Sequence, residues 1–157
     1  MSLRAWRIVK HKYSVEKAFD GEGARLYGGR WNSRGTAVVY TAESQSLAVL
    51  EMLVHLDSAD LLLNYIFYPV TIPNYLISDL AEADLPRNWQ FNPSPPGLRK
   101  IGNAWVGSAA SAVLRVPSSL VPAEYNYLLN PKHREFRELK IGSAVGYRLD
   151  PRLGKRE

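Results

Sequence analysis

The chain has 157 residues, of which 46% are hydrophobic and 22% are charged, and its formal net charge is +5. This length suits one domain with one buried core, and the composition excludes disordered, collagen-like and coiled-coil proteins. The absence of cysteine excludes a disulfide framework and any thiolate metal site, and no apolar run approaches the roughly 20 residues that span a bilayer.

The N-terminal part of the chain predicts two strands separated by an irregular loop. Residues 5–9 are rich in side chains that suit a pleated, half-buried surface. Four glycines between positions 21 and 29 favour irregular backbone that can approach a ligand closely. After a turn at 32–35, residues 37–41 are β-branched and aromatic and predict a second, buried strand.

A helix is predicted over residues 46–56, where leucine and valine side chains recur at helical spacing. Ser44, two residues earlier, is a suitable N-cap because its hydroxyl can accept a backbone N–H of the first turn. Glu51 lies one turn from both Leu47 and His55, so it projects from one end of the apolar face.

The middle of the chain predicts a strand, a long loop and a closely packed helix. Residues 61–72 hold many β-favouring side chains and predict the strand. Four prolines exclude regular structure over residues 85–97, which makes this loop the candidate lid. Residues 101–114 alternate small side chains with large apolar ones, a pattern that favours a helix.

The last part of the chain predicts short elements only. Residues 116–120 are extended, residues 125–129 form an apolar turn or strand, and Pro131 opens a C-terminal helix as its first residue. A final strand is predicted over residues 146–149. Because no linker or internal repeat is present, these elements predict a single α+β domain over residues 1–157.

The positive net charge does not by itself indicate nucleic-acid binding. The densest basic cluster, residues 132–140, is interleaved with Glu135 and Glu138, as on a solvated helix face. We therefore expect no direct contact with nucleic acid, while an anionic small molecule or an acidic protein can use the same charge. A chain without cysteine fits a reducing compartment, so a cytoplasmic location is expected.

Three blocks of the sequence, in order, resemble the RES-domain family. The blocks cover residues 28–35, which read Gly-Gly-Arg-Trp-Asn-Ser-Arg-Gly, residues 39–51, and residues 116–118 followed by 126–133. The family takes its name from an arginine, a glutamate and a serine, which are matched here by Arg30, Glu51 and Ser118. The resemblance covers about residues 5–150, nearly the whole chain.

The resemblance implies a compact fold similar to that of ADP-ribosyltransferase toxins, with a central mixed sheet split around an NAD-binding cleft. It also implies the toxin of a toxin–antitoxin pair, an enzyme that cleaves the nicotinamide–ribose bond of NAD⁺. Water, phosphate and a protein nucleophile all remain open as the acceptor. The expected protein partners are an Xre-type antitoxin and a second copy of the chain, as a homodimer within the toxin–antitoxin complex.

NAD⁺ is expected to be a consumed substrate, with no resident cofactor and no metal. The glycines do not spell the Gly-x-Gly-x-x-Gly fingerprint of a recycled dinucleotide, and no phosphate-binding P-loop occurs. The three histidines, at positions 11, 55 and 133, have no metal-ligand spacing.

The chemistry of NAD⁺ cleavage suggests a role for each charged site residue. The transition state carries positive charge on the ribose, so Glu51 is expected to stabilise that charge and bind a ribose hydroxyl. Arg30, beside two glycines, is expected to clamp the pyrophosphate through its planar fork, and Arg7 is expected to share this task. A surface salt bridge is the competing interpretation of Arg7.

Three neutral residues complete the predicted site. Tyr40 is expected to stack on the cationic nicotinamide ring, against the alternative of a simple core residue. Ser118 is expected to orient Glu51 or bind a ribose hydroxyl, because no nucleophile-elbow sequence supports a nucleophilic serine. Asn126, in the second part of the third block, is expected to contact NAD⁺.

Two functional hypotheses follow. The enzyme hypothesis predicts that Arg30, Tyr40, Glu51 and Ser118 converge on one concave site. The rival hypothesis is a catalytically silent module that binds an antitoxin or nucleic acid through its basic surface, and it predicts no such convergence.

Overall fold

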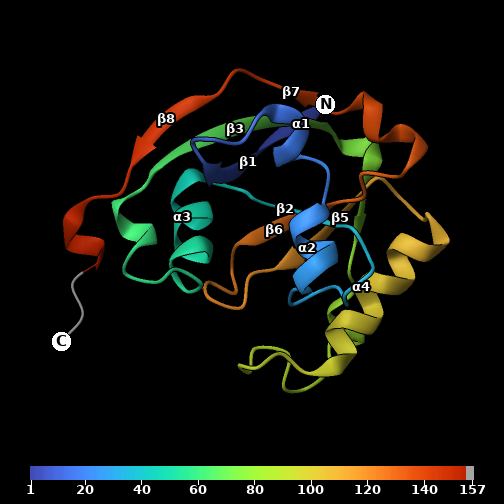
Figure 1. The fold of residues 1–157 in the computed structure, drawn as a ribbon. Coiled ribbons are helices and arrows are strands. Elements are labelled where there is room, and N and C mark those ends of the chain that lie inside the picture. The colour runs from blue at the N-terminus through green and yellow to red at the C-terminus, as the bar shows by residue number, and fades with distance from the viewer. Residues whose placement is uncertain (155–157) are drawn as a thin grey trace.

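Eight strands run through residues 1–154, the part of the chain that the computed structural model describes, and they form one mixed sheet (Figure 1). The order is β4-β5-β6-β2-β1-β3-β7, and β8 also pairs with β3. Only β4 and β5 are parallel neighbours within these residues. The bounds are β1 Ser2–Lys10, β2 Val39–Ala42, β3 Asn64–Pro73, β4 Ile77–Asp79, β5 Val113–Pro117, β6 Tyr125–Leu129, β7 Lys140–Ile141 and β8 Val145–Arg148.

The sheet consists of two halves. Strands pair extensively within each half but hardly at all between the halves. Strand β1 pairs with β3 along its whole length, and β2 pairs with β6 along its whole length. Between the halves, the ladder of β1 and β2 has one residue pair in the described part of the chain, Trp6 with Ala42. The expected α+β fold with a split mixed sheet is therefore confirmed. The predicted span of 1–157 also includes residues 155–157, which lie outside the described residues.

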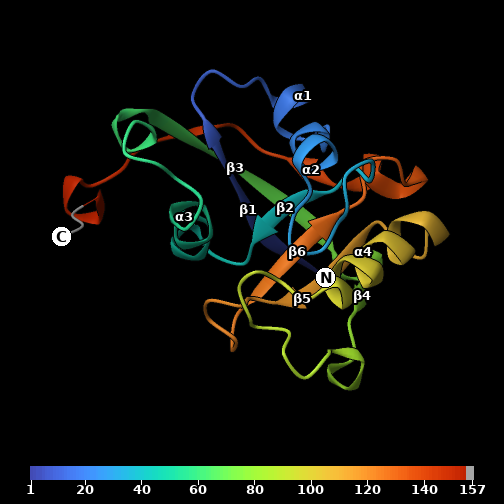
Figure 2. The same cartoon turned by 60° about the horizontal axis from the view of Figure 1, so that its bottom comes forward.

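The helices pack on the sheet and position the candidate site. Helix α3 and helix α4 lie on either side of strands β2 and β6 (Figure 2). The α-helices are α1 Val15–Ala18, α2 Glu22–Tyr27, α3 Gln45–Leu53 and α4 Pro96–Ser108. Short 3₁₀ turns occur at Asp60–Leu62, Asn74–Leu76, Glu82–Asp84, Arg134–Glu138 and Pro151–Gly154. Within residues 1–154, none of the helices has the length and apolarity needed to cross a bilayer.

The core lies on both faces of the sheet because side chains alternate along each strand. Val39 and Leu129 belong to a cluster on one face. On the other face, α4 buries Leu98 against β5 and β6, while α3 buries Leu47 against β2 and β3. Two helices thus cover separate parts of one face and leave β2 and β6 between them.

Most predicted elements are present. Strands β1, β2, β3, β6 and β8 lie at or near their predicted ranges. Helix α3 begins directly after Ser44, whose hydroxyl accepts the N–H of Leu47 at 3.1 Å as an N-cap does. The predicted third strand starts later than expected, at Asn64, because the side chain of Asp57 accepts backbone N–H groups and forms a turn first.

Two predictions differ from the structure in where helix is found. The glycine-rich stretch, predicted as irregular backbone, contains helix α2, and Gly21 and Gly28, which have positive φ angles, lie just outside it as its boundaries. The helix predicted over 101–114 begins at Pro96, an N1 proline that was assigned to the loop, and ends at Ser108. Residues from 113 onward belong to β5.

The prediction of a C-terminal helix after Pro131 was wrong. Asn130 and His133 accept backbone N–H groups through their side chains, which bends the chain locally instead of starting an α-helix. A 3₁₀ turn follows, and Leu139 is buried in the core immediately before β7. The extended stretch predicted over 116–120 ends at Pro117, because the next residues form a turn around Ser118.

Candidate active site

Tyr40 holds the loop at residues 28–32 through its hydroxyl group. The hydroxyl accepts the N–H of Trp31 at 3.1 Å and donates to Oδ1 of Asn32 at 2.6 Å. Burial raises the pKa of Tyr40 well above its usual value, so the hydroxyl remains a donor. A side chain at Gly29 would come within 2.7 Å of this oxygen, which explains the glycine.

Asn32 is a site residue that the sequence analysis did not single out. It is fully buried, and its amide nitrogen donates to the carbonyl oxygens of Ala24 and Thr36 at 2.8 and 3.0 Å. These bonds connect the loop to α2 and to the approach to β2. One feature of the sequence could have indicated Asn32: it is a polar residue directly after a tryptophan, in a block otherwise rich in glycine and arginine.

Arg30 connects the loop to the proline-rich segment, residues 85–95. Its Nη1 donates to the carbonyl oxygens of Trp89 and Phe91, both at 3.1 Å. Nε and Nη2 have no hydrogen bond to residues 1–154, and no carboxylate in that range forms an ion pair with Arg30. The segment is therefore held by one half of the guanidinium, and the other half is available to a ligand.

Arg7 lies where the two halves of the sheet separate. Its Nε donates to the carbonyl oxygen of Ala18 at 2.9 Å, and its Nη1 donates to that of Tyr40 at 3.1 Å. Burial lowers the pKa of Arg7 to about 10, and Asp20 and Tyr13 partly oppose the shift. No ion pair of Arg7 occurs in the described part, so the interpretation as a surface salt bridge was wrong.

Glu51 projects from α3 toward β6, where Asn126 donates a hydrogen bond from Nδ2 to its Oε2. Glu51 is half-buried, and Asn126 is 9% exposed. Among residues 1–154 no cation forms an ion pair with Glu51, and its second oxygen, Oε1, accepts no hydrogen bond. Within the described residues, one oxygen of the carboxylate thus has no hydrogen-bond or ion-pair partner.

Ser118 is fully buried in the turn between β5 and β6. Its hydroxyl oxygen accepts the N–H groups of Leu120 and Val121, both at 3.1 Å. Val121 packs against the cluster beneath α3, so the turn supports the helix that carries Glu51. Within the described residues, no hydrogen bond joins Ser118 to Glu51 directly.

The structure brings most of the predicted residues together in two groups. Arg30 lies near Tyr40, and Glu51 pairs with Asn126. Arg7 leaves β1 on the opposite face, with Ala5 and Val9, and it reaches only the backbone carbonyl of Tyr40. Tyr40 and Ala42 are two residues apart on β2, and Ala42 lies directly opposite Asn126 on β6. Residues at such positions point to the same face, which is the face between α3 and α4 (Figure 2).

Two hollows lie elsewhere, around β8. One, of about 340 Å³, is lined by residues of β3 and β8 and by His11, and the other, of about 410 Å³, lies between α3, β3 and Leu153. None of the six predicted site residues lines either hollow. No group of three or more possible metal ligands occurs in residues 1–154.

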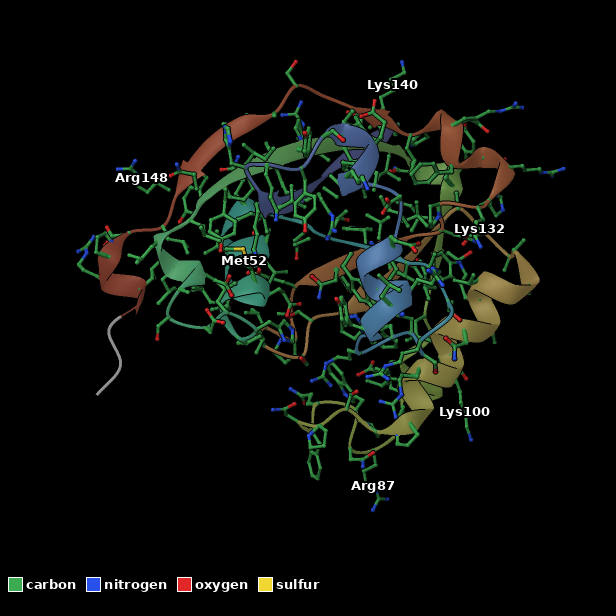
Figure 3. The ribbon with its side chains drawn as sticks, in the orientation of Figure 1. Met52, Arg87, Lys100, Lys132, Lys140 and Arg148 are labelled. Carbon is green, nitrogen blue, oxygen red and sulfur yellow. The ribbon has the colours of Figure 1, made fainter. Side chains whose placement is uncertain are left out.

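The basic side chains labelled in Figure 3 do not gather into one patch. Arg87, Lys100, Lys132, Lys140 and Arg148 belong to separate segments and point away from the ribbon on different sides of the molecule (Figure 3). These five residues therefore do not make a continuous basic surface with one another.

Comparisons with known proteins give one consistent result. The RES domain family model matches residues 4–150. A protein of Yersinia enterocolitica named Toxin Res is 41% identical over 152 residues, covering 96% of this chain and 99% of that protein. The Prs ADP-ribosylating toxin of a Sphingobium strain is 36% identical over 157 residues, covering 98% of each. A solved structure, the MbcT-MbcA toxin-antitoxin complex of M. tuberculosis, is similar in fold, with a TM-score of 0.77, 18% identity, and coverage of 98% of this chain and 87% of that one.

Proposed function

This chain belongs to the RES domain family. We propose that it is the toxin of a toxin–antitoxin system and that it consumes NAD⁺ by cleaving the nicotinamide–ribose bond. NAD⁺ is the substrate in this proposal, and no resident cofactor takes part. The printed name of the Sphingobium relative, an ADP-ribosylating toxin, supports a reaction of this class.

The observation that carries the proposal is a set of opposite charges that do not neutralise one another. In the described residues, Glu51, Arg7 and Arg30 form no ion pair with one another or with other side chains. NAD⁺ has a cationic nicotinamide end and an anionic pyrophosphate. A free carboxylate and two partly free guanidinium groups therefore match its two parts.

In the proposed reaction, the bond between ribose C1′ and the nicotinamide nitrogen breaks, and its electron pair goes to the nicotinamide ring. Positive charge then develops on C1′ and the ribose oxygen, as in glycoside hydrolysis. The carboxylate of Glu51 stabilises this charge and binds a ribose hydroxyl. An oxygen of the acceptor adds to C1′ and loses its proton.

The other site residues bind and orient NAD⁺ in this scheme. Arg7 and Arg30 donate to the pyrophosphate oxygens from the N–H groups that the protein leaves free. Tyr40 offers its ring to the nicotinamide while its hydroxyl stays bonded to the loop. Ser118 contributes through the turn that supports α3.

The acceptor and the partners form a second part of the proposal. Water, phosphate or a protein side chain accepts the ADP-ribosyl group, and the three products differ: free ADP-ribose, its 1-phosphate, or labelled protein. An antitoxin holds the toxin inactive, a partnership supported by the toxin–antitoxin complex among the similar structures. We propose an Xre-type antitoxin, a homodimer within the complex, and action in the cytoplasm.

The main test compares Glu51→Gln with wild type in an assay of nicotinamide release. The substitution keeps the size of the side chain and its bond to Asn126 but removes the charge, so we expect turnover to fall at least ~100-fold with an unchanged melting temperature. Glu43→Gln is the matched control, because Glu43 also bonds β6, at the N–H of Tyr125, and we expect wild-type turnover.

Two outcomes would contradict the proposal. Folded Glu51→Gln protein with wild-type turnover would remove Glu51 from the reaction. Wild-type protein that releases no nicotinamide, with any of the three acceptors present, would refute NAD⁺ cleavage and favour the silent interaction module.

A further inference from the structure

Asn126 occupies one of the most constrained positions in the molecule. It lies on β6, which is paired on both sides, with Asn126 opposite Ala42 of β2 and Val116 of β5. A residue in the interior of a sheet has its backbone fixed by two ladders, so its short side chain has few positions to adopt. Asn126 is also only 9% exposed.

Glu51 is the opposite case. It lies near the C-terminal end of α3, a helix of nine residues, and its side chain is long and flexible. In the described part of the chain its carboxylate has one hydrogen bond, from Nδ2 of Asn126 to Oε2. A constrained donor therefore fixes a flexible acceptor.

The chemistry of the donor suits this purpose. An amide N–H can hold one carboxylate oxygen without adding a positive charge, unlike lysine, arginine or protonated histidine. The charge of Glu51 therefore stays available to the ribose. The hydrogen bond to Oε2 also distinguishes the two oxygens, because Oε1 has no such bond within residues 1–154.

We propose that Asn126 is a positioning residue for Glu51: its amide holds Oε2, so that Oε1 is the oxygen presented to the ribose of NAD⁺. This inference rests on the proposed function and revises the expectation that Asn126 binds NAD⁺ itself. Asn126 affects the reaction through Glu51, and its loss changes the rate of bond cleavage but not the affinity for NAD⁺.

The first test measures kcat and KM for Asn126→Ala and Asn126→Asp. Asn126→Ala removes the donor, and we expect kcat to fall roughly 10- to 100-fold with KM within about 2-fold of wild type. Asn126→Asp keeps the shape but places a second carboxylate beside Glu51, so we expect a larger fall in kcat. A raised KM with unchanged kcat would overturn the inference and restore Asn126 as an NAD⁺ ligand.

Thr41→Val is the matched control for general loosening of the sheet. Thr41 is buried in the same β2–β6 ladder, and its hydroxyl donates to the carbonyl oxygen of Tyr127 at 2.8 Å. This variant loses a side-chain hydrogen bond between the same two strands and leaves Glu51 unchanged. We expect Thr41→Val to have a lower melting temperature and wild-type kcat. If its kcat fell as much as that of Asn126→Ala, the effect of Asn126 would be shown to be merely structural.

A double-mutant cycle gives the sharpest test. If Asn126 acts only through Glu51, adding Asn126→Ala to Glu51→Ala costs less than about 2-fold in residual turnover. Penalties that multiply would show that the two residues act independently, and would overturn the inference. NAD⁺ binding to the inactive Glu51→Gln protein, measured by calorimetry, is expected to be unchanged when Asn126→Ala is added.

One measurement does not depend on turnover, so failure of this inference and failure of the proposed function remain distinguishable. The side-chain amide of Asn126 gives its own signals in the nitrogen–proton NMR spectrum of the whole chain. We expect Glu51→Ala to shift these signals strongly and Glu43→Gln to leave them in place. No shift would overturn the contact itself, whereas a shift together with an inactive wild type would refute NAD⁺ cleavage and, with it, the role of Asn126.

Discussion

The candidate site combines two regions that are held in place by different means. Arg7, Tyr40 and Asn126 lie on strands β1, β2 and β6, so the ladders of the sheet set their positions. The loop at 28–32 and the proline-rich segment lie outside the sheet. Individual side chains hold them: the hydroxyl of Tyr40 and the amide of Asn32 hold the loop, and Nη1 of Arg30 holds the segment.

The difference has a practical consequence for mutations. A strand residue keeps its place when one side chain is lost, because its backbone hydrogen bonds remain. A loop residue depends on one or two side-chain bonds, so a single substitution can release it. Changes at the loop should therefore show first in local stability, and changes on the strands should show first in the reaction.

Gly102→Ala should have the largest effect on the loop-held region. A methyl group at this position on α4 would lie 1.7 Å from the carbonyl oxygen of Trp31, so the helix and the loop would have to separate. We expect the free energy of unfolding to fall by more than about 3 kcal/mol, measured by chemical denaturation. Gly107→Ala, on the same helix with no atom within 4 Å, should be neutral or stabilising by up to ~1 kcal/mol. Equal stability of the two variants would show that α4 does not support the loop.

Tyr40→Phe breaks the connection between the two regions while keeping the aromatic ring. It leaves the N–H of Trp31 and Oδ1 of Asn32 without their common partner. We expect a loss of about 2 kcal/mol in the free energy of unfolding, because buried polar groups left unpaired cost about 1 to 3 kcal/mol. Tyr27→Phe, at a residue that is 78% exposed, is the control and should change stability by less than ~0.5 kcal/mol. A stable Tyr40→Phe protein would mean that the loop has other sufficient anchors.

Ser118→Ala tests whether the serine acts on the reaction directly or through the turn. Two backbone N–H groups lose their acceptor, so we expect a loss of about 1 to 2 kcal/mol in stability and a turnover reduced between roughly 5- and 150-fold. The neighbouring variant Ser119→Ala should leave both unchanged. An inactive but stable protein, together with an ADP-ribosyl adduct on wild-type Ser118 in mass spectra, would require a covalent mechanism.

Arg30→Lys should have the smallest effect on global stability. Its effect should be confined to the proline-rich segment and to NAD⁺ binding. Lysine keeps the charge but not the planar fork that reaches two carbonyl oxygens and leaves N–H groups for phosphate. We expect unchanged global stability, but amide exchange at Trp89 and Phe91 that is roughly 10-fold faster, and weaker NAD⁺ binding. Arg87→Lys, in the same segment, is the control. Unchanged exchange in Arg30→Lys would show that the segment does not depend on Arg30.

The comparison of the two regions also explains which elements were predictable. Helix α3 was predicted closely, since the Ser44 cap and the apolar spacing are local signals that its final packing satisfies. The predicted bounds of helix α4 were displaced toward the C-terminus. Val113 and Leu114 fit a helical pattern, but in the structure they belong to β5 and pair with β6. The helix expected after Pro131 does not form, because the side chains of Asn130 and His133 accept hydrogen bonds from backbone N–H groups there.

By itself, the sequence determined the runs of strand and helix residues, the blocks that resemble the RES-domain family, and the chemical types available for a site. Only the tertiary structure decided which of those residues meet. The bond from Arg30 to Trp89 spans 59 positions, and the bond from Asn126 to Glu51 spans 75. No local periodicity encodes such pairs. Asn126 meets Glu51 because β6 pairs with β2, the strand that leads into α3, and Arg30 meets Trp89 because two segments outside the sheet lie together.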